Sequence, residues 1–167
     1  MGILRALIGK LDRTLGFPVA YAHCDIPCGI YDPHAAQVAA HTVIRMDMLI
    51  ADIMKAGATS AEDRNKMVRC IEVKEQHAEI LKHEITVLWG DYFKPEHAKD
   101  HPELHDLVWN TLKLASKAKQ STDIKAAEDL LESVQNVAEA FWMTKKVATV
   151  RVKSFYPTER TMVYPKV

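Results

Sequence analysis

Two thiols and a histidine lie close together near the N-terminus of this 167-residue chain. Cys24 and Cys28 are four positions apart, Pro27 lies between them, and His23 comes directly before the first thiol. In a turn, this spacing can bring both sulfurs to one ion. Thiolates are soft ligands that select zinc, Cu(I), Fe–S clusters and, in square-planar sites with nitrogen donors, Ni(II). The spacing alone does not choose among these, because two cysteines so placed also occur by chance.

The number and spacing of the cysteines exclude several kinds of metal and redox site. The third and last cysteine, Cys70, falls at a core-like position of a helical pattern. A structural zinc site normally uses four side-chain ligands, so one pair of thiols does not make a zinc finger. A thioredoxin-like site would need C-x2-C on a βαβ pattern, and neither is present. An odd number of cysteines also makes a poor disulfide framework, which indicates a reducing compartment or a metal site.

Residues 1–22 form a separate segment that has two interpretations. Its apolar residues recur at helical spacing with basic residues between them, and they form a stripe instead of a solid apolar block. The segment ends on Ala20-Tyr21-Ala22, the small-x-small pattern after which a signal-type peptidase cuts. One interpretation is a leader that is removed after Ala22. The other is an extra N-terminal helix that packs on the core.

Cleavage after Ala22 would complete a set of ligands around the two thiols. His23 would become the N-terminal residue, and its α-amine would lie beside its own imidazole and the amide and thiol of Cys24. An amine, an amide nitrogen and two thiolates can surround one ion in a plane, which leaves the imidazole for an axial position. This set exists only after cleavage, because an acylated His23 nitrogen cannot donate its lone pair.

Composition excludes two classes of partner. The 22 basic and 22 acidic side chains cancel, whereas a nucleic-acid-binding protein normally carries a basic stripe. No run of about 18 apolar residues is present, so we expect no membrane span. The length fits one domain.

The remainder of the chain must hold the thiol segment in place, and its pattern is helical. Asp32-Pro33 predicts a helix start, and Ser60 to Asp63 resembles a capping box. Apolar residues recur at spacings of three and four in four stretches that short polar or Gly/Pro-containing joints separate. We therefore predict an all-α fold, an up-down-up-down four-helix bundle with an N-terminal metal-binding hook.

The predicted domain organisation has four parts. The first helix is apolar on more than one side, which indicates an oligomer interface as well as a core. The C-terminal segment alternates at Val150-Arg151-Val152 and contains aromatic residues and prolines, which predicts an extended tail on a surface, for example that of a neighbouring subunit. The parts are a cleavable leader (1–22), a metal hook (23–32), a four-helix bundle (33–147) and an extended tail (148–167).

The thiol segment resembles a known family. His-Cys-Asp-x-Pro-Cys-Gly-x-Tyr-Asp-Pro at residues 23–33 is similar to the nickel hook of nickel-containing superoxide dismutases. The similarity covers roughly residues 23–147. The resemblance implies a homohexamer of four-helix bundles, one nickel ion per subunit, a leader that a dedicated peptidase removes, and a cytoplasmic location. Further matching stretches are Lys74-Glu75-Gln76, Val87-Leu88-Trp89, residues 91–95, residues 102–105, Phe141-Trp142 and Thr144-Lys145-Lys146.

The resemblance also implies roles for individual residues. His23 would supply its amine and axial imidazole, Cys24 its amide nitrogen and sulfur, and Cys28 its sulfur. Tyr31 and Asp25 would line a small pocket above the metal, limit access to small anions and order water for proton transfer. The implied reaction is the disproportionation of superoxide to O2 and H2O2, with nickel alternating between Ni(II) and Ni(III).

The chain departs from the family at two positions. Ala39 and His77 stand where the best-known members carry an acidic residue and an arginine that orient the axial histidine. Partners behind a ligand normally fix its tautomer and tune the metal, so His77 or His41 is a candidate for this role. The simpler interpretation is that both are partly exposed helix histidines. Four further histidines at 83, 97, 101 and 105 are interpreted as surface residues.

A second function remains open at this stage. If residues 1–22 stay attached, the chain is a non-catalytic metal-binding or storage four-helix bundle. Cys24 and Cys28 could then still bind zinc or copper, but the amine donor would be missing.

Overall fold

The computed structural model describes residues 28–57 and 59–166, and the expected leader and residues 23–27 lie outside this range. The described chain is mostly helical, as the sequence predicted. Its elements are α2 (His34–Lys55), α3 (Ala61–Val87), a π-helical turn η1 (Leu88–Tyr92), α4 (Pro95–Asp100), α5 (Leu104–Gln120), α6 (Ile124–Thr144), β1 (Thr149–Lys153) and β2 (Thr161–Pro165).

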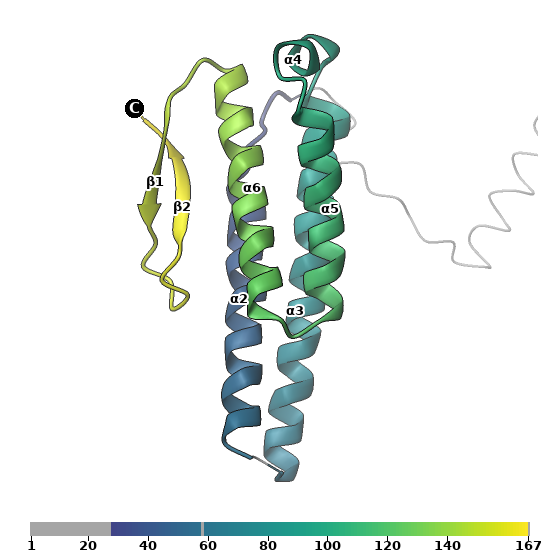
Figure 1. Ribbon diagram of the computed structural model, residues 1–167, viewed down its shortest axis with the longest axis vertical. Helices are drawn as coiled ribbons and strands as arrows, with labels where there is room; N and C mark the ends of the chain where they lie inside the picture. The colour runs from purple at the N-terminus through teal and green to yellow at the C-terminus, as the bar shows by residue number, and fades with distance from the viewer. Residues whose placement is uncertain (1–27, 58, 167) are drawn as a thin grey trace, which may run out of the picture.

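Four long helices form the body of the molecule. Figure 1 shows α2, α3, α5 and α6 side by side along the long axis, and the chain direction alternates from one to the next. The short helix α4 lies at the end of the molecule where α5 begins. None of the helices in the described ranges combines the length and apolar character that crossing a bilayer requires.

Local signals in the sequence set the helix ends. The Asp32 carboxylate accepts a hydrogen bond from the His34 amide at 2.7 Å, so Asp32 satisfies one of the unpaired amides at the start of α2. At α3, Ser60 Oγ accepts from the Asp63 amide at 3.1 Å and Asp63 Oδ2 accepts from the Ser60 amide at 3.2 Å. This is the predicted capping box. Gly57, with φ of +61°, follows α2 in the left-handed conformation that glycine adopts without strain.

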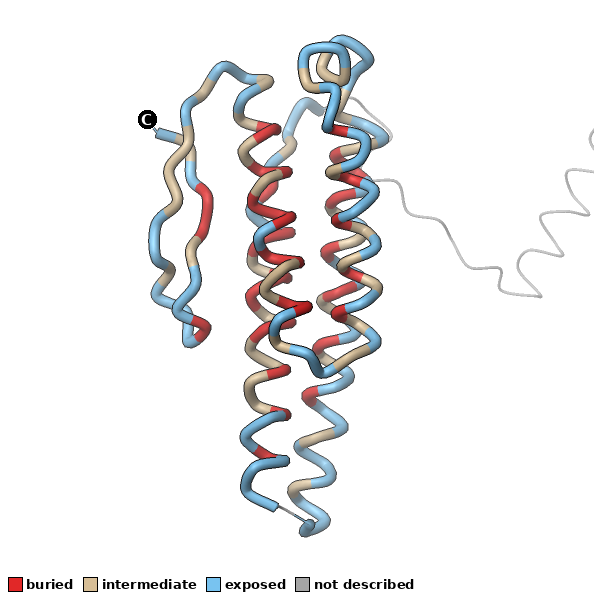
Figure 2. Tube along the Cα trace, in the orientation of Figure 1, coloured by how far each residue is buried: buried red, intermediate tan, exposed pale blue. Residues whose placement is uncertain are grey.

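The core lies on the inward faces of the four long helices, where Figure 2 shows the buried residues. The largest of these apolar side chains come from every long helix and are fully enclosed. Burial of such side chains is the main favourable contribution to the stability of the fold. They include Ile44, Leu81, Ile85, Leu104, Leu130 and Phe141.

One buried ion pair interrupts this apolar core. Lys74 Nζ lies 3.2 Å from Asp47 Oδ1, and the two side chains are 3% and 0% exposed. The same ammonium group donates a hydrogen bond to the Ser121 carbonyl. The pair therefore connects α2, α3 and the α5–α6 connection.

The C-terminal segment is a two-stranded antiparallel hairpin beside α2 and α6 (Figure 1). Arg151 lies opposite Val163, and Met162 and Val163 are buried. The sequence predicted extended backbone here, and the structure adds strand pairing, so the all-α description needs this correction. The physical reason is that the hairpin is held by side chains of α2 and α6, far away in sequence.

Candidate metal centre

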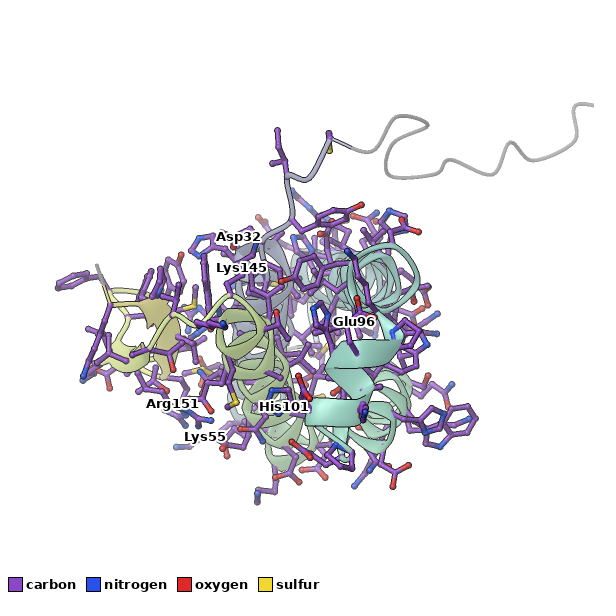
Figure 3. The ribbon with its side chains drawn as sticks, turned by 90° about the horizontal axis from the view of Figure 1, so that it is seen from above. Asp32, Lys55, Glu96, His101, Lys145 and Arg151 are labelled. Atoms are coloured by element: carbon purple, nitrogen blue, oxygen red, sulfur yellow. The ribbon has the colours of Figure 1, made fainter. Side chains whose placement is uncertain are left out.

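The described part of the hook begins at Cys28 and leads into α2. Cys28, Gly29 and Ile30 are exposed, and Figure 3 looks down on the end of the molecule where Asp32 lies. The Ile30 amide donates a hydrogen bond to Cys28 Sγ at 3.5 Å, and Gly29 between them has φ of +71°. A side chain at position 29 would be strained in this conformation. An exposed sulfur that accepts a hydrogen bond is accessible to a metal ion that takes sulfur ligands.

Tyr31 connects the hook to the core. Its ring is half-buried and lies 5.5 Å from the ring of Tyr92, at an angle of 52°. The centre of the Tyr92 ring in turn lies 4.5 Å from that of the Phe141 ring on α6. Lys145 Nζ lies about 5 Å from the centre of each of these two rings. An aromatic cluster at this end of the helices therefore supports the segment that contains Cys28.

Tyr92 is a residue near the site that sequence reasoning did not single out. Its hydroxyl lies 2.6 Å from Thr144 Oγ1, and the Thr144 hydroxyl donates its proton to the Phe141 carbonyl at 2.7 Å. Because Thr144 has only one proton to donate, Tyr92 must be the donor to Thr144. The only signal in the sequence was the match of residues 91–95 to the family, which does not say what Tyr92 touches.

Three of the predicted site residues lie outside the described residues. They are His23, Cys24 and Asp25. Of the remaining predicted site residues, Cys28 and Tyr31 lie in the same short segment before α2, and His77 lies on α3. Cys70 is buried in α3, at the core position that the sequence predicted.

The two positions that depart from the family differ in burial. Ala39 is buried in the core, and His77 is half-buried. His77 Nδ1 lies 2.8 Å from the Val73 carbonyl, one turn earlier on the same helix. A carbonyl oxygen can only accept, so Nδ1 carries the proton and Nε2 of the neutral ring keeps a lone pair.

His41 is not the partly exposed residue of the simpler interpretation, and its ring nitrogens contact the hairpin. Its side chain is buried. Nδ1 lies 2.6 Å from Thr158 Oγ1 and Nε2 lies 3.0 Å from the Thr161 carbonyl, so both ring nitrogens contact the hairpin. Because the carbonyl can only accept, Nε2 donates to Thr161 and Nδ1 accepts from the Thr158 hydroxyl. Burial lowers the pKa of His41, and the charge of Arg160 lowers it further.

The histidines around the α3–α5 connection have separate polar contacts. His97 Nδ1 accepts from the Lys94 amide at 3.2 Å, whereas His101 and His105 lie beside Glu103 and Asp106. Within residues 28–57 and 59–166, no three His, Cys, Asp or Glu side chains gather closely enough to hold a metal ion.

Fold and site together define a class: a mostly helical protein with an exposed thiol in a short segment before its first long described helix. The family model of nickel-containing superoxide dismutase matches residues 18–145. The superoxide dismutases [Ni] of Streptomyces coelicolor and Streptomyces seoulensis are each 42% identical over 125 residues, which cover 75% of this chain and 89% of theirs. The chain therefore belongs to the nickel-containing superoxide dismutase family.

Solved structures of the family have the same helical fold. A native crystal structure of nickel superoxide dismutase is 41% identical and has a TM-score of 0.64, with 74% of this chain and 99% of that chain covered. A crystal structure with nickel ligation of the oxidised state gives the same values. The hairpin begins at Thr149, after the last residue that the family model matches.

Proposed function

We propose that this chain is a nickel superoxide dismutase, which converts two superoxide anions and two protons to O2 and H2O2. The observation that carries the proposal is the family match over residues 18–145, which includes both hook cysteines and His23. The alternative, a non-catalytic metal-binding or storage protein with its leader attached, has no comparable support.

The residues proposed to hold nickel are those of the hook. His23 supplies its amine and imidazole, Cys24 its amide nitrogen and sulfur, and Cys28 its sulfur. Bound nickel supplies the one-electron redox chemistry, because thiolate and amide donors stabilise its higher oxidation state. The Ile30 amide donates a hydrogen bond to Cys28 Sγ at 3.5 Å, which supports an ordered position for this proposed ligand.

The proposed roles of the surrounding residues concern access and protons. Tyr31 lies within the hook, and the packing of its ring on Tyr92 supports a fixed position for it. Together with Asp25, Tyr31 would admit small anions and order water that carries protons to the reduced substrate. The lone pair on His77 Nε2 can accept a hydrogen bond from the His23 imidazole, and this would replace the acidic and arginine partners of the family.

The proposed assembly follows the family. The hook precedes a four-helix bundle, and six subunits associate in the cytoplasm after a maturation peptidase has cut after Ala22. Several large apolar side chains on the outside of the helices are exposed in the single chain, which supports association. They include Met54, Val68, Ile80 and Trp109.

The test is to measure the mass, N-terminal sequence and metal content of the protein purified from its native host. We expect a chain that starts at His23 and contains one nickel ion per subunit. An intact chain that starts at Met1 and contains no nickel would refute the proposal and favour the storage protein.

A further inference from the structure

The hairpin is bound to α2 by hydrogen bonds to its backbone. Gln37 Oε1 accepts from the Val163 amide at 2.7 Å, and Gln37 Nε2 donates to the Val163 carbonyl at 3.1 Å. His41 Nε2 donates to the Thr161 carbonyl at 3.0 Å. Gln37 is 1% exposed, and its carboxamide pairs with both the amide and the carbonyl of a single residue of β2.

These contacts lie on one edge of β2. In an antiparallel pair, alternate residues direct their backbone groups to opposite edges. Ser154 bonds to Arg160 and Lys166 bonds to Ala148, which continues the series of bonded pairs that includes Val150 with Tyr164. The intervening residues Thr161 and Val163 therefore direct their backbone groups away from β1 and toward α2.

Helix α2 takes the place of a third strand along this edge. Gln37 and His41 are one turn apart, about 6 Å along the helix axis at 1.5 Å per residue. Thr161 and Val163 are about 6.6 Å apart along the strand. The two repeats are nearly equal, so Gln37 pairs both backbone groups of Val163, and His41 pairs with the Thr161 carbonyl, which also accepts from Gln135.

The hairpin is also fixed to α6. The Arg151 guanidinium lies 2.7 Å from Glu139, 2.8 Å from Glu132 and 2.6 Å from Asn136. Figure 3 shows Arg151 on the hairpin side of the molecule, away from Glu96 of α4. Gln135, also on α6, donates to the Thr161 carbonyl at 2.5 Å. The hairpin is thus attached to two helices at once.

The contacts on α2 are concentrated in its first two turns. The His34 ring lies 6.2 Å from the ring of Tyr164. Residues 34, 37 and 41 share one side of the helix because they are three and four positions apart. The hook continues directly into this part of α2, since the Asp32 carboxylate binds the His34 amide.

We propose that the C-terminal hairpin positions the metal-binding segment, and that Gln37 is the positioning residue through which it acts. The inference rests on the proposed function in one respect, which is that residues 23–28 hold the metal. The hairpin fixes the first two turns of α2 against α6, and these turns fix the segment from Cys28 to Asp32. The family match ends before the hairpin, so this is a feature of the chain that the family model does not contain.

Hydrogen exchange on the metal-free, full-length chain tests the proposal without reference to activity. The variant Gln37→Leu removes both hydrogen bonds to Val163 and replaces the carboxamide with an apolar side chain of similar size. The amides of residues 37–41 in α2 should then exchange at least roughly tenfold faster, since local opening sets exchange rates. The matched control is Gln76→Leu, which replaces a carboxamide with the same apolar side chain on α3, where Gln76 bonds to Glu72 at 3.3 Å, and it should leave these α2 amides near wild-type rates.

A second variant and a spectroscopic measurement complete the test. Tyr164→Ala removes an exposed ring that contacts His34, so it should leave the fold intact and speed exchange at the same amides by a smaller factor. In nickel-loaded protein, Gln37→Leu should broaden the nitrogen hyperfine pattern of the nickel electron paramagnetic resonance spectrum, and Gln76→Leu should not.

Two outcomes would overturn the proposal. In one, Gln37→Leu speeds exchange at residues 161–164 but leaves residues 37–41 and the nickel spectrum unchanged, so the hairpin would not position α2. In the other, neither region changes, so Gln37 would not hold the hairpin. If wild-type protein binds no nickel, the proposed function fails, whereas the exchange experiment still decides whether the hairpin braces α2.

Discussion

At the scale of single residues, the two described cysteines have different surroundings. Cys28 is exposed, lies in the segment before α2 and accepts a hydrogen bond from the Ile30 amide. Cys70 is buried within α3. An exposed thiol that accepts hydrogen bonds suits metal binding, whereas a buried thiol acts as a small apolar side chain.

This contrast predicts that the two thiols differ in their effect on nickel binding. In the mature protein, Cys28→Ser should lower the nickel content at least roughly tenfold, because a hydroxyl is a much harder ligand than a thiolate. Cys70→Ser is the matched control and should keep the nickel content of the wild type. Elemental analysis of both purified variants measures the effect, and equal nickel contents would argue against Cys28 as a ligand.

His41 makes the docking of the hairpin dependent on pH. Burial and the charge of Arg160 lower the pKa of His41 below its usual value of 6.5. An undocked hairpin would expose the imidazole, which would then bind a proton more readily than in the docked state. Docking is therefore strongest above about pH 6.5 and weakens as the pH falls toward the lowered pKa.

Hydrogen exchange at residues 161–164, corrected for the intrinsic effect of pH, should show protection that decreases from pH 7.5 to 5.5. His41→Gln retains polar groups but cannot titrate, so its protection should be independent of pH over this range. Protection that decreased equally in both proteins would assign the pH dependence to another group.

At the scale of elements, the buried pair of Asp47 and Lys74 joins α2 to α3. Burial raises the pKa of Asp47, and the nearby Lys74 ammonium opposes this rise. Removal of one member of such a pair leaves an uncompensated charge in the core. We therefore expect the pair to stabilise the packing of α2 against α3.

Lys74→Met should lower the free energy of unfolding by about 3–5 kcal/mol at pH 7. Without the ammonium group, the pKa of Asp47 rises further, and the neutral carboxyl is favoured in the folded state. The loss should therefore be smaller at pH 5 than at pH 7, because a group with a raised pKa stabilises the fold below that pKa. Urea unfolding at both values measures this.

The matched control is Lys82→Met on the same helix, where the lysine is one-third exposed and 3.8 Å from Glu79. This change should alter the free energy of unfolding by less than about 1 kcal/mol, since exposed pairs contribute little. Equal losses in both variants would contradict the account of the buried pair.

Helices could be predicted from the sequence because their signals are local. The start of α2 at Asp32 and the capping box at Ser60 each involve residues two or three positions apart. The pairing of the hairpin and its docking could not be predicted in this way. Gln37 binds Val163 across 126 positions and His41 binds Thr158 across 117, and no periodicity reports such distant partners. For the same reason, the sequence did not predict that His41 is buried and bonded to the hairpin.

The candidate metal site could be predicted from the sequence only in part. Its proposed ligand residues rest on their spacing and on the family resemblance, and the structure adds the contacts of Cys28, Tyr31 and Tyr92. The support from Tyr92 and Thr144 depends on contacts between η1 and α6, which the sequence of the hook does not contain.

At the scale of the whole molecule, the helices, the hairpin and the aromatic cluster converge on the start of α2. The hook itself is short and cannot fold alone, so the packed helices must supply the order that a metal site requires. The central claim is that the site forms only when His23 is the first residue, because its amine is then a ligand.

The most direct test compares two mature chains that differ by one residue. One starts at His23 and the other at Ala22, and both are refolded with nickel under identical conditions. The decay of superoxide after pulse radiolysis should be rapid with the first protein and close to the uncatalysed rate with the second, in which the His23 nitrogen is acylated. Equal catalysis by both proteins would contradict the account, because it would show that the amine of His23 is not required.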